Sequence, residues 1–254
     1  METIFGNQMT FTLPSGKVVT IREQNGADDD VLSNPMYAKD MMNISNFISG
    51  IVVNSDITPN GKLSPEQVHR MPVLDKYCIL INSRIFSLGE TLEFSYKWGN
   101  GEEFDYEQNL NELIFDYAQE PTQDMLDSKP NAIPYYPMRG EVKDLEFSTK
   151  TGKRLMFDLL TSEGEAYVLG LPLDKQTKNQ ELVARNLRLQ VGEKWEKVQN
   201  FAVFSVSEMR DIRSFIKGVD PIYSGTVDIE NPSTGQKTKV AVMGIDGFFY
   251  TRED

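Results

Sequence analysis

The sequence lacks most of the side chains from which catalytic and metal centres are built. Its 254 residues include one cysteine, Cys78, and one histidine, His69. A single cysteine excludes a disulfide framework or a thiolate metal cluster within one chain. No serine or cysteine nucleophile can be paired with His69 by sequence logic. We therefore predict no enzyme and no cofactor, and we expect Cys78, in the apolar run "YCILI", to be a small core residue.

Long hydrophobic runs and an excess of positive charge are also missing. No apolar run approaches the roughly 18 residues of a membrane span, and the N-terminal residues lack the basic and apolar regions of a signal peptide. The formal net charge is −12, whereas binding to a phosphate backbone relies on clustered Lys and Arg. We expect a protein of a cytosol-like compartment, with no nucleic acid, membrane or small-molecule substrate as its partner.

The negative charge is concentrated in the first half of the chain. Residues 1–130 hold 9 Lys and Arg against 20 Asp and Glu, while residues 131–254 hold 17 against 18. A solvated acidic face and a docking surface for a basic partner both fit this pattern, and Glu102, Glu103, Asp105 and Glu107 are our candidates for the latter. The densest stretch has nine carboxylates and no Lys or Arg between them: Glu102, Glu103, Asp105, Glu107, Glu112, Asp116, Glu120, Asp124 and Asp127.

A Gly-Lys pair stands in the opening stretch "FTLPSGKVVTI", residues 11–21. A phosphate-binding P-loop needs G-x-x-x-x-G-K-[ST], but Phe11 replaces the first glycine and Val18 replaces the hydroxyl residue. Apolar residues alternate with polar ones on both sides of "PSGK", which is turn chemistry. The stretch therefore predicts a β-hairpin.

The same pattern returns in "FSTKTGKRLMF", residues 147–157. In each half a helical stripe follows the hairpin, a second helical stripe follows that, and a further hairpin closes the half. The second stripe of the later half opens at Ser205 and Glu208 with the spacing of a capping box. Identical residues recur at an offset of 136 residues, among them Phe11/Phe147, Gly16/Gly152, Lys17/Lys153, Asn43/Asn179, Asp75/Asp211, Gly89/Gly225 and Gly99/Gly235.

These patterns predict an α+β protein of two tandem pseudo-repeats. Each repeat has the order hairpin, helix, helix, hairpin, with antiparallel sheet covered by helices on one side. We place the first repeat at residues 1–117, a proline-rich linker at 118–143 and the second repeat at 144–254. Tyr135 and Tyr136 predict that the linker is ordered, because they are expected to pack on a neighbouring element.

The stretch "DITPNGKLSPEQ", residues 56–67, partly matches the EF-hand calcium loop. Its candidate ligands are Asp56, Asn60, Ser64 and Gln67, at positions one, five, nine and twelve. Thr58 stands at position three, and Gln67 replaces the bidentate Glu that normally supplies much of the affinity. A Pro/Gly-rich surface loop is the favoured interpretation, so no metal is predicted.

The two tryptophans, Trp98 and Trp195, are further candidates for protein or sugar contacts. Each lies in an alternating apolar pattern, where core or interface packing is the commoner role. Carboxylate pairs are plentiful, so a glycosidase-like pair stays open, although none is singled out.

The stretches "LPSGKVVTIRE", "VLDKYCILINSRIFSLGETLEF", "GNGEEFDYEQNL" and "GFFYTRED" resemble the baseplate protein family of T-even-like (Myoviridae-type) phages, which includes a hub assembly protein. Asp75, Arg84, Ser87 and Gly89 match its passage from helix to strand. The resemblance covers most of residues 9–117 and the last few residues. Some relatives carry cysteines near "SYKWGNGEE", where this chain has none, so no metal role is carried over.

The resemblance implies a non-enzymatic component of a contractile tail baseplate that binds other baseplate, hub or tail proteins. Its location would be the virion, with the host cytoplasm as the site of assembly. A tail assembly chaperone that leaves before the virion matures is an alternative. Two further alternatives stay open: a calcium- or carbohydrate-binding accessory module, and an enzyme acting on cell-wall glycan.

Overall fold

A computed structural model describes residues 7–38, 42–140, 142–244 and 247–249. The protein is α+β, as predicted, with helices and several small antiparallel sheets. Residues 250–254 of the C-terminal stretch used for the resemblance lie outside the described residues. Among the helices of the described ranges, none combines the length and the hydropathy that crossing a membrane requires.

The first region pairs a three-stranded sheet with helices. Strand order is β1-β2-β3, and both pairings are antiparallel. The strands are β1 (Gln8–Thr12), β2 (Val18–Arg22) and β3 (Val52–Ser55). The helices are α1 (Gly26–Ser33), α2 (Pro35–Ala38), α3 (Met42–Ile51), α4 (Pro65–His69) and α5 (Val73–Leu88).

The second region has a four-stranded sheet of order β6-β7-β8-β9. Its strands are β6 (Leu145–Ser148), β7 (Arg154–Phe157), β8 (Arg188–Val191) and β9 (Lys194–Lys197). Its helical elements are α7 (Ser162–Gly170), η2 (Leu173–Lys175), α8 (Lys178–Ala184), η3 (Phe201–Val203) and α9 (Val206–Val219). The predicted capping box is confirmed, because the Ser205 hydroxyl accepts from Glu208 N while the Glu208 carboxylate accepts from Ser205 N.

Both Gly-Lys stretches form hairpin turns, as predicted. Leu13 N donates to Lys17 O at 2.7 Å, and Thr149 N donates to Lys153 O at 2.9 Å. Gly16 and Gly152 have φ of +86° and +87°, a conformation that glycine adopts without the steric cost of a Cβ.

The predicted direct succession of helix to helix is wrong in both regions. A third strand, β3 or β8, follows the first set of helices and pairs with the second strand of the hairpin. Each of these strands has only four residues, and the apolar pattern of α3 runs into β3 without a turn signal. In the second repeat, we predict the first helical stripe from Leu182, Val183 and Leu187. The helix ends earlier, since α8 stops at Ala184 and Leu187 lies beyond it. The duplication itself stays a prediction.

The core continues from one region into the other. Helix α5 is buried on several sides, and Cys78 is a core residue, as predicted. Val73 N donates to Leu160 O at 2.9 Å, and Ser162 N donates to Met71 O at 3.1 Å. The start of α5 is therefore fastened to the segment that precedes α7.

The segment between the two regions is packed against α5 and the first hairpin. It contains α6 (Gln123–Ser128). Tyr136 is 1% exposed, and its hydroxyl accepts from Leu74 N at 3.2 Å. Gly140 N donates to Ser15 O at 3.0 Å. The predicted packing of Tyr136 is confirmed, whereas the domain boundaries at 117 and 144 stay predictions.

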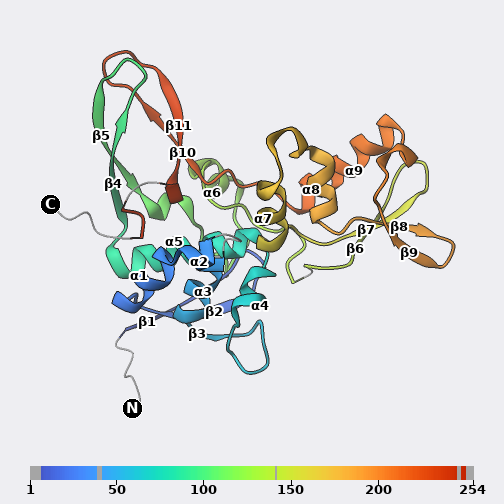
Figure 1. Cartoon of the computed structure of the whole chain (residues 1–254), viewed down its shortest axis with the longest axis horizontal. Helices are drawn as coiled ribbons and strands as arrows, with labels where there is room; N and C mark the ends of the chain where they lie inside the picture. Colours follow the sequence, from blue (N-terminus) through green and yellow to red (C-terminus); the bar gives the residue numbers. More distant parts are fainter. Residues whose placement is uncertain (1–6, 39–41, 141, 245–246, 250–254) are drawn as a thin grey trace.

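Two further hairpins lie side by side at one end of the molecule, although the first ends at Asn109 and the second begins at Thr226 (Figure 1). They are β4 (Thr91–Lys97) with β5 (Glu103–Asn109), and β10 (Thr226–Glu230) with β11 (Lys237–Ala241). Short 3₁₀ helices, η1 (Leu110–Leu113) and η4 (Val242–Gly244), follow them. Helix α9 and the β6–β9 sheet lie at the opposite end (Figure 1).

Candidate protein-interaction surfaces

The two neighbouring hairpins are held together through their apolar sides. Strand alternation buries Leu92 and Phe94 on β4 and Val227 and Ile229 on β10. Tyr106 on β5 stacks on Phe94, with ring centroids 5.7 Å apart. The Tyr106 hydroxyl donates to Glu230 O at 3.1 Å. Alternation in a strand sends neighbouring side chains to opposite faces, so the other face of β4–β5 is free to be polar.

Trp98 belongs to the inner side of this arrangement. It is 4% exposed, and its indole Nε1 donates to the Tyr106 hydroxyl at 2.9 Å. Its ring contacts Tyr96 edge to face, with centroids 5.2 Å apart. Trp98 therefore has the packing role that the alternating pattern favours, and its ring is not presented to a partner.

The outer face of β4–β5 is acidic. We define the acidic face as Glu93, Glu103, Asp105 and Glu107, all of them exposed. Glu93 stands directly opposite Glu107 in the strand register, Ser95 opposite Asp105, and Lys97 opposite Glu103. Like charges directly opposite each other destabilise a strand pair. The Glu93/Glu107 pair is therefore unfavourable for the isolated hairpin.

Glu102 does not belong to the acidic face, although it precedes Glu103 in the chain. Its carboxylate accepts from Asn100 Nδ2 at 2.5 Å and from Asn231 Nδ2 at 3.3 Å. These hydrogen bonds, the one from Asn100 first, lower the pKa of Glu102 below its usual value. Glu102 therefore joins the two hairpins, and the sequence grouped it with the acidic face only because it is adjacent in the chain.

The remaining carboxylates of the stretch do not continue this face along the strand. Asp116 accepts from Ala118 N at 3.0 Å, Glu112 from Gln108 Nε2 at 3.0 Å, and Asp127 from Gln123 Nε2 at 2.8 Å. These are local contacts in turns and short helices. The long acidic run in the sequence thus becomes one compact face plus scattered surface groups.

Trp195 lies on β9, at the other end of the molecule from Trp98. It is half-buried, and the Arg154 guanidinium lies over its ring at 5.7 Å from the centroid. Arg154 also forms an exposed ion pair with Glu146 at 2.6 Å. Part of the Trp195 ring remains accessible, so its role as a contact residue stays a prediction.

The four EF-hand candidates take part in turns and a helix cap. Asp56 Oδ1 accepts from Val18 N at 2.9 Å, and Asn60 Oδ1 accepts from Lys62 N at 3.1 Å. Ser64 and Gln67 form the capping box of α4. Across the described residues, no group of three or more His, Cys, Asp or Glu side chains is placed to hold a metal ion.

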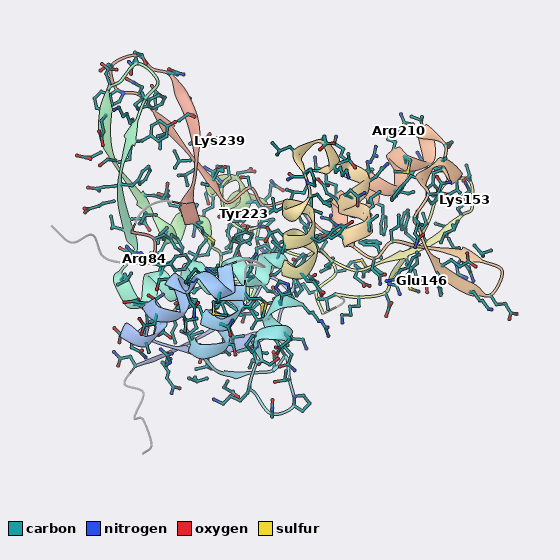
Figure 2. The ribbon with its side chains drawn as sticks, viewed as in Figure 1. Arg84, Glu146, Lys153, Arg210, Tyr223 and Lys239 are labelled. Carbon is teal, nitrogen blue, oxygen red and sulfur yellow. The ribbon has the colours of Figure 1, made fainter. Side chains whose placement is uncertain are left out.

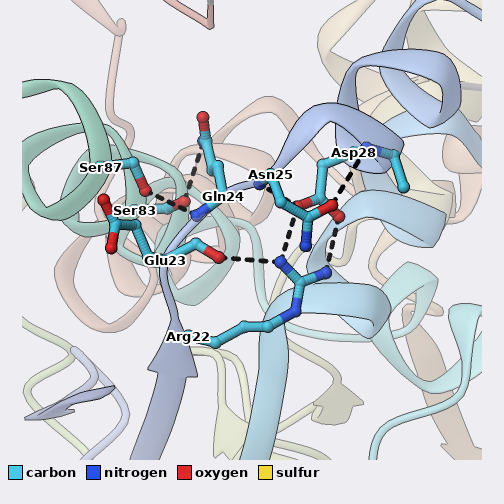
Figure 3. Close-up of polar contacts among 8 residues, drawn as sticks. Arg22, Glu23, Gln24, Asn25, Asp28, Ser83 and Ser87 are labelled. Carbon is cyan, nitrogen blue, oxygen red and sulfur yellow. Dashed lines mark hydrogen bonds and ion pairs between the residues drawn. The ribbon is translucent and has the colours of Figure 1, made fainter. Parts of the chain in front are cut away.

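The residues that carry the phage resemblance form hydrogen bonds between α5 and the segments beside it. Asp75 Oδ1 accepts from Ser15 N at 3.0 Å, in the turn of the first hairpin. Arg84 donates to Gly89 O at 2.8 Å and to Thr91 O at 3.2 Å, beyond the end of the helix. Ser87 Oγ accepts from Gln24 N at 2.9 Å (Figure 3). These positions are structural.

Asp75 is the carboxyl of this set, and its surroundings shift its pKa. It is buried, and burial raises its pKa to about 7, although the hydrogen bonds from Ser15 oppose the shift. A perturbed carboxyl can mark a catalytic site. Here its partner is the amide N–H of a tight turn, which gives it a structural purpose.

A groove of about 740 Å³ runs beside α9 and was not predicted. We define the basic groove by Phe201, Val206, Met209, Arg210, Arg213 and Lys217, and its full lining contains no Asp or Glu. Arg210, Arg213 and Lys217 are spaced i, i+3 and i+7, so they follow one side of the helix. That spacing is visible in the sequence and could have indicated a basic stripe.

No protein-family model matches the chain, no curated protein is significantly similar to it, and no solved structure matches it significantly.

Proposed function

We propose that the protein is a non-enzymatic structural or assembly component of a contractile phage tail baseplate, in the hub region, which acts through contacts with other proteins. The observation that carries the proposal is the acidic face of β4–β5, in which Glu93 stands opposite Glu107. Burying the basic residues of a partner against these carboxylates would relieve their mutual repulsion. The resemblance of the α5 passage supports the baseplate assignment.

Quantitative mass spectrometry of purified mature particles and of the infected-cell lysate tests the assignment. Retention in particles at a fixed copy number is the expected result for a baseplate subunit. Depletion from particles, with co-purification on partial baseplates, would instead assign the protein as a tail assembly chaperone. Absence from both would overturn the proposal.

Charge reversal tests the surface. The double variant Glu103→Lys and Asp105→Lys should abolish co-purification with partial baseplates, because it inverts the centre of the acidic face. Glu120→Lys with Asp124→Lys is the matched control, since both residues are exposed, lie outside the face and change the net charge equally. Equal loss of binding in both variants would show that bulk charge, and not this face, is responsible.

A further inference from the structure

We propose that the basic groove binds the acidic face of a second copy of this chain, so that copies associate head to tail. The inference rests on the proposed function and deepens it, because it names the partner of the acidic face. Two surfaces of opposite charge on one chain carry it, together with their positions at the two ends of the molecule.

The charges of α9 are divided between two sides of the helix. Glu208 pairs with Lys153 at 3.1 Å, and Asp211 pairs with Lys150 at 3.6 Å, both toward the β6–β7 hairpin. Arg210 and Lys217 have no ion-pair partner within the part of the chain that the structure describes, and Arg213 donates to Asn179 Oδ1 at 2.9 Å. The carboxylates of α9 are thus directed away from the groove, which leaves it positive.

The groove also offers apolar surface. Val206, in its lining, is 90% exposed, and Val203 on the adjoining η3 is 48% exposed. Phe201 and Met209 contribute further apolar lining. Apolar surface combined with arginine is typical of protein interfaces, and opposite charges across an interface favour association and fix its register. The groove therefore has the chemistry of a docking site for an acidic partner surface.

The acidic face is the complementary surface within this chain. The neighbouring hairpin does not compete, because its outer charges are paired: Lys237 with Glu230 at 3.3 Å and Lys239 with Asp228 at 3.6 Å. On β4–β5, by contrast, four carboxylates share the outer face with Lys97. Of these two hairpins, β4–β5 thus presents the surface with excess negative charge.

The two surfaces cannot meet within one molecule. The β4–β5 hairpin lies at one end of the longest axis and α9 at the other (Figure 1), and Arg210 is correspondingly far from Lys239 of the neighbouring hairpin (Figure 2). A contact between different surfaces of identical chains generates a ring if its rotation closes and a filament if it does not.

Two neutralising triple variants of the full chain provide the test, in analytical ultracentrifugation at low salt. One variant, Glu103→Gln with Asp105→Asn and Glu107→Gln, neutralises three of the four carboxylates of the acidic face. The other, Arg210→Gln with Arg213→Gln and Lys217→Gln, lacks the basic groove. Wild type should self-associate, less strongly at high salt, and each variant alone should dissociate at least about tenfold more readily. An equimolar mixture should form a two-chain species that grows no further, since only one native contact remains.

Circular dichroism confirms that each variant folds, and Lys175→Gln with Lys194→Gln and Lys197→Gln is the control with an equal charge change at exposed residues outside the groove. That control should associate like wild type. Monomeric wild type at every concentration, or a mixture that fails to pair, would overturn the inference. Self-association of a protein that is absent from both mature particles and partial baseplates would instead overturn the proposed function and leave the head-to-tail contact in place.

Discussion

The two Gly-Lys hairpins have the same turn, but the carboxylates that hold them differ. In the first region, Ser15 N donates to Asp75, a buried carboxyl on α5. In the second, the Thr151 hydroxyl donates to Glu208 at 2.5 Å, and Lys153 adds an ion pair at 3.1 Å. Thr151 lies 136 residues after Ser15, the offset of the predicted repeat, and the two residues contact a helix carboxylate by different chemistry.

Because of this difference, the two carboxyls have different pKa values. Burial raises the pKa of Asp75 to about 7. Hydrogen bonds from Thr151, Ser205 and Lys153 hold the pKa of Glu208 at about 2. In both regions a carboxylate accepts a hydrogen bond from the hairpin turn. The burial and the hydrogen-bond partners of that carboxylate decide how the stability of each region depends on pH.

The buried Arg–Asp pairs of the two regions differ in a related way. Arg22 and Asp28 form two hydrogen bonds of 2.7 Å over six residues, between β2 and α1 (Figure 3). Arg185 and Asp220 pair at 2.8 Å over 35 residues and join the ends of α8 and α9. The first pair fixes local structure, while the second fixes the packing of distant helices.

Breaking the long-range pair should have the largest effect. Asp220→Ala leaves Arg185 buried without its carboxylate and removes the acceptor of Leu160 N. Removing one partner of a buried pair costs about 3–5 kcal/mol, and we expect a loss of that size in urea denaturation. Glu146→Ala, which breaks an exposed pair, is the control and should cost at most about 1 kcal/mol.

Asp75→Asn should remove the pH dependence of the first region. The folded pKa lies above the unfolded value of 3.8, so the folded state binds the proton more tightly and wild-type stability falls as pH rises from about 4 to 7. The amide keeps an acceptor for Ser15 N without the charge. At pH 8 the variant should be more stable by up to about 4 kcal/mol, measured by urea denaturation between pH 4 and 8. A variant less stable than wild type at pH 8 would contradict the assignment.

The helix contacts of the two regions should tolerate a methyl group differently. A Cβ on Gly164 would meet Ala184 O at 2.9 Å, whereas a Cβ on Gly50 would meet Asp28 Oδ1 at 3.7 Å. Gly164→Ala should cost about 1–3 kcal/mol by overpacking. Gly50→Ala should be neutral or stabilise by up to about 1 kcal/mol, from helix propensity. Thermal unfolding of both variants measures the two changes in stability, and equal changes would contradict the prediction.

The smallest effect is expected from Glu208→Gln. The folded pKa of Glu208 lies below its unfolded value of 4.5, so its contribution is present above pH 4.5 and is lost as pH falls toward 2. The variant should show a shallower loss of stability over that acidic range and no change in the pH 4 to 8 dependence that we attribute to Asp75. An unchanged acid limb in denaturation curves would exclude this role.

Local patterns in the sequence predicted the elements whose signals are contained within a few residues. The turns at Gly16 and Gly152, the stripes of α5 and α9 and the capping box at Ser205 depend on turn chemistry and helical periodicity, which act over one or two turns of chain. The burial of Cys78 followed from its apolar neighbours in the same way.

Tertiary structure alone decided the rest. Strands β3 and β8 are four residues long, and such short strands are defined by the hydrogen bonds of a partner strand and not by their own propensity. The contact between the two closing hairpins turned Glu102 and Trp98 inward and left Glu103, Asp105 and Glu107 outside. The sequence by itself determined the composition of the acidic run and the basic spacing of α9, whereas only long-range packing decided which of these charges face solvent as surfaces.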